Sequence, residues 1–199
     1  MHRKVAANLL LDKSGGITFP WMGPRVQAAP KLRLDGAAPT ELQIVYDATW
    51  SDGVEPSSWQ AAFTYNGAAF ATALGTISLT NLSSSDAESY SLSMALARGV
   101  VYRNVLTFLG AAPAGRTAAW GDNSAVVGVA GNSQSPSGLR HIMRRVKHIQ
   151  EMTEEAFDSR HVDDKNNMID FYGKYVSGKK AAMSVTYLAN RRLAAPVVG

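Results

Sequence analysis

The chain has 199 residues, 46% of them hydrophobic, and this length and composition suit one well-filled globular domain with an appendage. It contains no cysteine, which excludes disulfides, thiolate metal sites and cysteine nucleophiles and favours a reducing, intracellular compartment. No segment has the roughly 18–20 uninterrupted apolar residues that a bilayer span requires, and no signal peptide is clear, so we expect no membrane span.

The net charge of +4 is distributed unevenly along the chain. The stretch from Arg33 to Arg98 has no basic residue between its ends but carries seven acidic residues. Residues 135–150 contain no acidic residue and these six basic ones: Arg140, His141, Arg144, Arg145, Lys147 and His148. An acidic region and a basic region in one chain suit a protein that binds a cation with one part and a polyanion with another.

Glycine and proline recur through residues 15–39, which argues against long regular elements there. Residues 1–40 are therefore expected to form a short helix followed by an irregular N-terminal arm. A β-prone segment at residues 42–46 opens the main domain, and a second one follows at residues 59–65. Asn66-Gly67 is a strong signal for a two-residue hairpin turn, because a type I′ turn needs positive φ at both central positions. The returning strand is expected at residues 68–74 and a further strand at residues 76–82.

The hydrophobic period then changes to three and four residues, which predicts a helix from about residue 85 to a point before Gly110. Five further elements are expected: a strand at residues 117–120, a helix at 124–130, a basic helix at 139–157, a brief strand at 161–162 and a helical region at 166–190 that is broken at Gly178. An antiparallel start followed by alternating helices and strands predicts an α/β domain, with helices packed on a mixed sheet.

Four acidic residues lie at the ends of these predicted elements: Asp47, Glu88, Asp122 and Asp170. A side chain at the end of a helix or strand can project into a shared cleft from a rigid support. Magnesium prefers carboxylate oxygens together with phosphate and water. Four carboxylates can hold two such ions roughly 4 Å apart, an arrangement that catalyses phosphodiester hydrolysis.

Local structure offers another explanation for three of these residues. Ser85 and Glu88 fit a capping box, in which Ser85 caps the helix and Glu88 bonds back to its amide. Asp122 fits a turn with a helix cap, and Asp170 fits a first-turn acid at the positive end of a helix dipole. Composition and periodicity leave both explanations open.

Five short motifs follow one another along the chain: Tyr46-Asp47-Ala48-Thr49-Trp50, Leu82-Ser83-Ser84-Ser85-Asp86-Ala87-Glu88, Asp122-Asn123-Ser124-Ala125, the segment 137–151 with Arg140-His141-Ile142, and the segment 161–174 with Asn167-Met168-Ile169-Asp170 and Lys174. In this order they resemble the motifs of the ribonuclease H domain of copia-type (Pseudoviridae-like) LTR retrotransposon polyproteins. The resemblance covers about residues 41–190, and it defines one domain between an arm at residues 1–40 and a tail at residues 191–199.

The resemblance implies a ribonuclease H-like fold with a mixed five-stranded sheet. It also implies that four residues are catalytic ligands of Mg²⁺ or Mn²⁺: Asp47, Glu88, Asp122 and Asp170. In that family the domain degrades the RNA strand of an RNA–DNA hybrid. The chain departs from the family motifs at Thr49, Ser89, Ile169 and Gly173, where the family has an acid, Tyr, Ala and Thr. None of these departures removes a ligand.

Basic side chains provide further candidates. His161 lies nine residues before Asp170 and is a candidate proton shuttle to the leaving group, although a strand-end histidine without a catalytic part fits the sequence as well. Arg140, Arg144 and Lys147 share one stripe of the predicted basic helix. This stripe suits contacts with the backbone of a hybrid duplex, but it also suits a solvated helix face.

The sequence therefore favours a metal-dependent endonuclease, derived from a retroelement, that cleaves the RNA strand of RNA–DNA hybrids. The alternative is a catalytically silent, domesticated fragment that serves as a structural or binding subunit of a larger assembly, because a fold does not guarantee its chemistry. The expected partners are an RNA–DNA hybrid and either a reverse transcriptase domain or that larger assembly.

Overall fold

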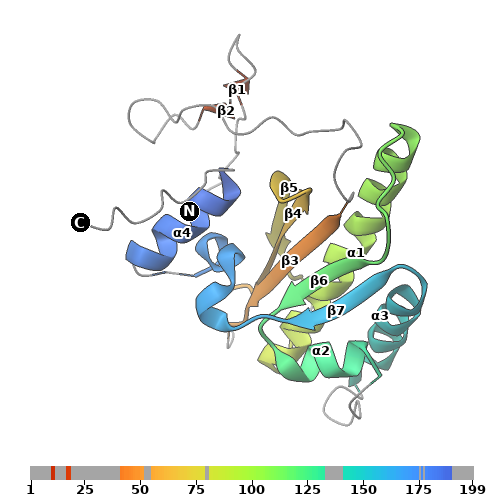
Figure 1. Cartoon of the computed structure of the whole chain (residues 1–199). Helices are drawn as coiled ribbons and strands as arrows, with labels where there is room; N and C mark the ends of the chain where they lie inside the picture. The colour runs from red at the N-terminus through yellow and green to blue at the C-terminus, as the bar shows by residue number, and fades with distance from the viewer. Residues whose placement is uncertain are drawn as a thin grey trace.

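The computed structural model describes residues 10–11, 17–18, 41–51, 55–78, 81–132, 141–174, 176 and 178–189. One mixed sheet with the strand order β5-β4-β3-β6-β7 forms the centre of the main domain (Figure 1). Its strands are β3 (Leu42–Thr49), β4 (Ser58–Tyr65), β5 (Ala68–Thr76), β6 (Thr117–Gly121) and β7 (Phe157–His161). Neighbours are antiparallel from β3 to β5 and parallel from β3 through β6 to β7, which confirms the predicted mixed five-stranded sheet.

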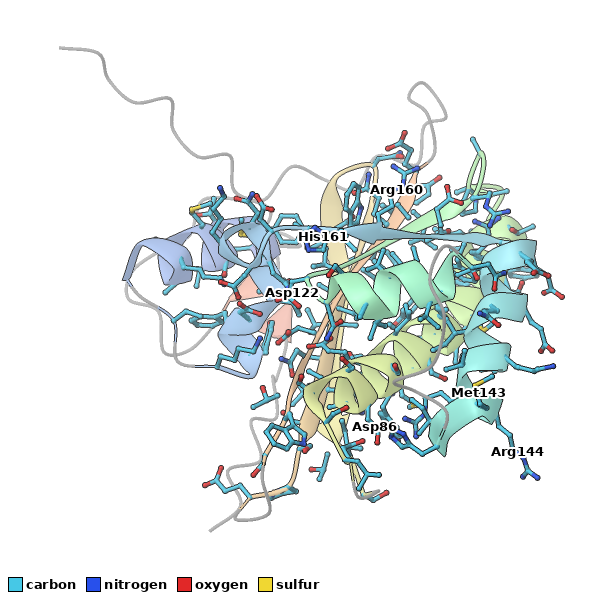
Figure 2. The ribbon with its side chains drawn as sticks, turned by 90° about the horizontal axis from the view of Figure 1, so that it is seen from below. Asp86, Asp122, Met143, Arg144, Arg160 and His161 are labelled. Atoms are coloured by element: carbon cyan, nitrogen blue, oxygen red, sulfur yellow. The ribbon has the colours of Figure 1, made fainter. Side chains whose placement is uncertain are left out.

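Helices cover both faces of this sheet. They are α1 (Ser84–Phe108), α2 (Ser124–Ala130), α3 (Met143–Glu155) and α4 (Gly178–Leu188), with the short 3₁₀ helices η2 (Asp164–Asn166) and η3 (Met168–Tyr172). Figures 1 and 2 show α1, α2 and α3 on one face, with η3 and α4 on the other. Among the described helices, none has the length and apolar character needed to cross a membrane.

The antiparallel half of the sheet begins as a hairpin. Asn66 and Gly67 join β4 to β5 with φ values of 51° and 77°. Positive φ at both positions is the type I′ geometry that the dipeptide predicts, and its twist matches that of the flanking strands. The turn places β4 between β3 and β5, so that β4 is buried on both faces.

Side chains of β3 alternate between two environments. Ile44, Tyr46 and Ala48 are buried in the main hydrophobic core, together with Leu92 and Leu96 of α1. Burial of each such large apolar side chain contributes about 1.5–3 kcal/mol relative to an exposed one. Because successive residues of a strand point to opposite faces, the residues between them point toward η3 and α4. A polar residue in this second set is therefore held rigidly beneath the opposite layer.

The start of α1 differs from the predicted capping box. Ser83, not Ser85, is the N-cap, and its side chain accepts a hydrogen bond from the backbone N of Asp86. The Asp86 carboxylate accepts one from the backbone N of Leu82 at 3.2 Å. Asp86 thus accepts from the residue before the N-cap, whereas the acid of a capping box accepts from the N-cap amide itself. The prediction that Ser85 and Glu88 form the box is wrong, and Glu88 is left for other contacts.

Other predicted elements need correction as well. No separate strand forms at residues 76–82 within the described part: Thr76 is the last residue of β5, and the described residues between it and α1 are not in a strand. Most of the predicted N-terminal helix lies outside the described residues, although Leu10–Leu11 is a strand paired with Ile17–Thr18. The basic helix is shorter than predicted, since α3 ends at Glu155 and Phe157 begins β7. The break at Gly178 is confirmed, because α4 starts there.

Candidate metal centre

Asp47 lies near the carboxyl end of β3 and is completely buried. It points to the face that carries η3, as its place in the strand alternation requires. Gln60 is its partner directly across the antiparallel pair, and the Gln60 amide donates to Asp47 Oδ2 at 2.5 Å. The backbone of the same strand is fixed by Ser91 of α1, whose hydroxyl donates to the carbonyl oxygen of Asp47 at 2.6 Å. Both the side chain and the main chain of Asp47 are therefore positioned.

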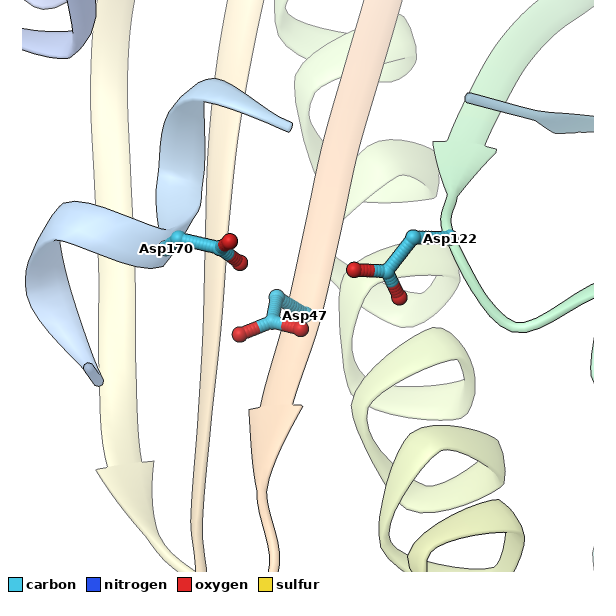
Figure 3. Close-up of side chains that lie close together, drawn as sticks. All are labelled: Asp47, Asp122 and Asp170. Atoms are coloured by element: carbon cyan, nitrogen blue, oxygen red, sulfur yellow. The ribbon is translucent and has the colours of Figure 1, made fainter. Parts of the chain in front are cut away.

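Asp122 and Asp170 approach Asp47 from two other elements. Asp122 directly follows β6, which runs parallel beside β3, so that the carboxyl ends of both strands lie together. Asp170 is buried in η3 on the opposite layer. Each of the three residues offers a carboxylate oxygen, and these oxygens all lie within 4.8 Å of one another. Figure 3 shows the three side chains converging, and we call them the carboxylate cluster.

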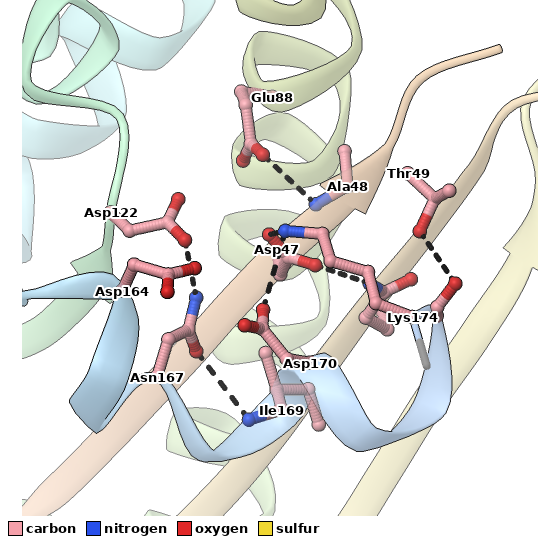
Figure 4. Close-up of polar contacts among 12 residues, drawn as sticks. Asp47, Ala48, Thr49, Glu88, Asp122, Asp164, Asn167, Ile169, Asp170 and Lys174 are labelled. Atoms are coloured by element: carbon pink, nitrogen blue, oxygen red, sulfur yellow. Dashed lines mark hydrogen bonds and ion pairs between the residues drawn. The ribbon is translucent and has the colours of Figure 1, made fainter. Parts of the chain in front are cut away.

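Glu88 lies beside this cluster without belonging to it. It enters from α1, and its Oε1 accepts a hydrogen bond from the backbone N of Ala48 at 3.2 Å (Figure 4). Its other oxygen, Oε2, is buried and has no hydrogen-bond partner among the described residues. A buried carboxylate oxygen without a partner is unfavourable, and a bound ion is one way to satisfy it. Of the four predicted ligands, three thus converge and the fourth lies next to them.

Two lysines neutralise part of this negative charge. Lys174 Nζ lies 2.9 Å from Asp47 Oδ1 and 3.4 Å from Asp170 Oδ1 (Figure 4). Lys180, from α4, bonds to the other carboxylate oxygen of Asp170. Burial opposes the charged form of Lys174, but the carboxylates of Asp47 and Asp170 outweigh it and raise its pKa above the ordinary value. Neither lysine was predicted as a site residue, although Lys174 belongs to the closing motif of the resemblance.

Two carboxyl groups of the centre have strongly raised pKa values. Burial raises the pKa of Asp47 from 3.8 to about 7, although Lys174 opposes the change. Burial also raises the pKa of Glu88, from 4.5 to about 9, and the neighbouring charges of Asp47 and Asp122 add to this effect. Crowding of acids in a buried place is therefore unfavourable without a compensating cation.

The metal-free protein is expected to lose stability as the pH rises from about 5 to about 9. Both folded-state pKa values lie above the unfolded ones, so the stability contribution is complete below about pH 4 and is lost as the pH passes the folded values. The expected slope is roughly 1 kcal/mol per pH unit for each group. Urea unfolding in EDTA at several pH values measures it. Asp47→Asn should flatten the slope up to about pH 7, and an unchanged slope would contradict this interpretation.

The donor set fits a divalent cation of the magnesium type. All ligand atoms are carboxylate oxygens, which Mg²⁺ and Mn²⁺ prefer, and the described residues bring no cysteine or histidine into the cluster. The unsatisfied Oε2 of Glu88 is an additional acceptor at the same end of β3. A cluster of three acids in this geometry supports divalent-metal use.

His161 ends β7 beside Asp122. Its side chain is exposed, and its Nε2 lies 3.1 Å from the carbonyl oxygen of Asp122. The two residues are adjacent because β7 pairs in parallel with β6, opposite Gly121. The structure thus places this predicted shuttle at the edge of the carboxylate cluster, and its role stays a prediction.

The predicted basic stripe is described only in part. Arg140 lies outside the described residues, whereas Arg144 and Lys147 are exposed on α3. Figure 2 shows Arg144 pointing away from the sheet. A different basic residue of this helix, Arg145, turns inward and bonds to the buried Asp86 at 2.6 Å. The charge of α3 is therefore divided between a structural ion pair and an exposed surface.

Two site residues carried weak or no signals in the sequence. Gln60 lies opposite Asp47 because of the register between β3 and β4. The length of the loop between the two strands does not determine this register, so the sequence did not indicate the contact. Asn167 is completely buried, caps η3, and donates to Asp122 Oδ2 at 3.3 Å. Its position three residues before Asp170 is a helix-start pattern that could have indicated the cap but not the contact with Asp122.

Comparison with solved structures identifies the fold. RNase H1 from the halophilic archaeon Halobacterium salinarum NRC-1 is similar, with a TM-score of 0.51 and 14% identity over 64% of this chain and 89% of that chain. LC11-RNase H1, isolated from compost, is similar with a TM-score of 0.51 and 15% identity over 64% of this chain and 88% of its own. No family model and no curated protein matches the chain. The main domain of this protein has a ribonuclease H-like fold.

Proposed function

We propose that this domain is a divalent-metal-dependent endonuclease that cleaves the RNA strand of RNA–DNA hybrids. The observation that carries the proposal is the convergence of Asp47, Asp122 and Asp170, with oxygens within 4.8 Å of one another, in a ribonuclease H-like fold. Their positions also match three of the motifs through which the sequence resembles the copia-type ribonuclease H domain. That resemblance, which includes Glu88, is the ground for a retroelement origin and for a reverse transcriptase domain as partner.

The four acids would hold Mg²⁺ or Mn²⁺ at the carboxyl ends of β3 and β6. A bound ion of this kind lowers the pKa of a water molecule and stabilises negative charge on a phosphodiester. The chain contributes fixed ligands, because Gln60 holds the Asp47 carboxylate and Asn167 holds that of Asp122. Ligands that are already oriented cost little reorganisation during reaction.

His161 and the exposed face of α3 complete the proposal. The Nε2 of His161 lies beside the backbone of Asp122, from where it would carry a proton to the leaving oxygen. Arg144 and Lys147 would contact phosphates of the hybrid, which accounts for affinity but not for sequence preference. Recognition would then follow the shape and 2′-hydroxyls of the hybrid.

The test is cleavage of an end-labelled RNA strand by the purified full chain. With Mg²⁺ or Mn²⁺, the RNA of an RNA–DNA hybrid should be cut, whereas RNA–RNA and DNA–DNA duplexes should stay intact. EDTA should abolish the reaction. Absence of cleavage with either ion would contradict the proposal.

One observation favours the alternative, a catalytically silent subunit. The second half of α1 and its C-cap residue expose four apolar side chains by 47–89%: Val101, Val105, Phe108 and the C-cap Leu109. Exposed apolar groups on one helix end are typical of a binding surface. A protein without hybrid cleavage above the level of its Asp122→Asn variant would support this second function.

A further inference from the structure

The two sides of the metal centre differ in what neutralises them. On one side, Asp47 Oδ1 and Asp170 Oδ1 share the ammonium of Lys174, and Asp170 Oδ2 bonds to Lys180. We call this the lysine side. The positive charge that a metal ion would supply on this side is already supplied by the two lysines.

The other side consists of Asp122, Glu88 and the neighbouring edge of Asp47. Asp122 receives a hydrogen bond from the neutral amide of Asn167, at 3.3 Å, and neither Asp122 nor Glu88 forms an ion pair within the described residues. Glu88 is 94% buried, since its relative exposure is 6%, and its Oε2 has no hydrogen-bond partner there. We call this the open side, because its acceptors are not satisfied by the described part of the chain.

The formal charges of the centre indicate how many divalent ions it can hold. The four acids carry four negative charges when ionised, and Lys174 and Lys180 carry two positive ones. Asp164 also pairs with Lys180, but its side chain is 75% exposed and its charge is screened by solvent, so a charge of −2 is left in the buried centre. One divalent cation compensates this remainder, whereas two would leave the buried centre with an excess of +2. An uncompensated buried charge is costly, because the low dielectric strengthens every interaction.

Backbone hydrogen bonds of Lys174 and of the preceding Gly173 hold Lys174 in place. Its N donates to the carbonyl oxygen of Asp170 at 2.8 Å, and the hydroxyl of Thr49 donates to the carbonyl oxygen of Gly173 at 3.0 Å. Gly173 lies so close to Thr49 and Gln60 that a Cβ atom there would collide with both side chains. Thr49 and Gly173 are two of the positions at which the chain departs from the family motifs, and here they meet.

We propose that Lys174 is a built-in cation of this centre, and that the chain therefore binds a single divalent ion, on the open side. This inference rests on the proposed function and deepens it. Lys174 takes the place of one ion of a two-ion arrangement and keeps Asp47 and Asp170 together. The open side, with Glu88 and Asp122, is where the divalent ion binds.

Calorimetric titration of the full chain with Mn²⁺ tests the number of ions. The wild type should bind one ion per chain, and Lys174→Met should bind two, because Oδ1 of Asp47 and Oδ1 of Asp170 then lose the ammonium that they share. Lys174→Gln provides a second, polar replacement at this half-exposed position. Lys174→Arg keeps the charge and should bind one ion. Lys165→Met is the matched control, since Lys165 is exposed, pairs with Asp163 and should leave the number at one.

A second titration tests the position of the ion. Glu88→Gln should weaken Mn²⁺ binding by about tenfold or more, because it removes a carboxylate ligand of the open side, whereas Asp170→Asn should change it less than about threefold. Two ions in the wild type, one ion in both neutral Lys174 variants, or the reverse order of the two acid variants would overturn the inference and leave the proposed function standing. No Mn²⁺ binding by any of these proteins would overturn the proposed function, and the inference with it.

Discussion

Asp122→Asn is expected to lower the rate of hybrid cleavage by about 1000-fold or more. The substitution keeps the size of the side chain and its contact with Asn167, but it removes one of the three carboxylates that converge within 4.8 Å. A ligand to a catalytic ion contributes several kcal/mol of transition-state stabilisation, and each 1.4 kcal/mol or so corresponds to a factor of ten in rate. Single-turnover cleavage of a labelled hybrid measures the change.

Asp163→Asn is the matched control for this experiment. Its side chain is 60% exposed and pairs with Lys165, and it is not one of the three carboxylates that converge. The control should cleave at the wild-type rate and unfold at the wild-type denaturant concentration within experimental error, and Asp122→Asn should stay folded under the conditions of the cleavage assay. An Asp122→Asn protein that retains more than about a tenth of the rate would exclude Asp122 from the reaction.

Arg145→Ala is expected to destabilise the fold by about 3 kcal/mol, the second large effect. Asp86 is 2% exposed, and Arg145 bonds to its carboxylate at 2.6 Å while lying over the ring of Tyr90. His141 lies 3.3 Å from the same carboxylate, but its ring is charged only when protonated. Removing Arg145 therefore leaves a buried carboxylate without its main partner, which is strongly destabilising.

Arg144→Ala provides the comparison on the same helix. Arg144 precedes Arg145 and is exposed, so its removal should change the free energy of unfolding by less than about 0.5 kcal/mol. Chemical denaturation of both variants gives the difference. Equal effects of the two substitutions would mean that Arg145 does not anchor α3 to the start of α1.

The Asp86 ion pair explains why the sequence alone misplaced the helix cap. Ser83, Ser84 and Ser85 are consecutive, and each is a good N-cap on local grounds. The structure selects Ser83, since Asp86 is held by Arg145 and His141, which lie 59 and 55 residues further along the chain. A contact at that separation has no local signal. The choice matters for the site, because it leaves Glu88 free to reach the end of β3.

Strand periodicity did predict the positions of Asp47 and Asp122. Both follow β-prone segments, and β3 and β6 are parallel neighbours, so their carboxyl ends meet. The prediction of a fourth strand at residues 76–82 was wrong for a physical reason. The pairing continues through a hydrogen bond from the N of Ile77 to the carbonyl oxygen of Ser57, but the chain then turns into α1. Propensity does not show where a strand loses its partner.

The two lysines of the site could not be predicted from the sequence, for a different reason. Lys180 lies on α4, whose packing against η3 brings it to Asp170, and the two residues are ten positions apart, a separation without a local signal. Lys174 is four residues after Asp170, a spacing that also fits an ordinary surface pair. Only the buried position of Asp47 shows that this lysine neutralises an interior charge.

The central claim is that distant carboxylates join to bind a divalent cation, and thermal unfolding with increasing Mg²⁺ at pH 8 tests it most directly. A ligand that binds only the folded state stabilises it by about 2.7 kcal/mol at 100 times its dissociation constant. The unfolding temperature of the wild type should therefore rise with Mg²⁺, and that of Asp47→Asn should not. An equal rise in both proteins, or none in the wild type, would show that these four segments of chain do not form a metal site.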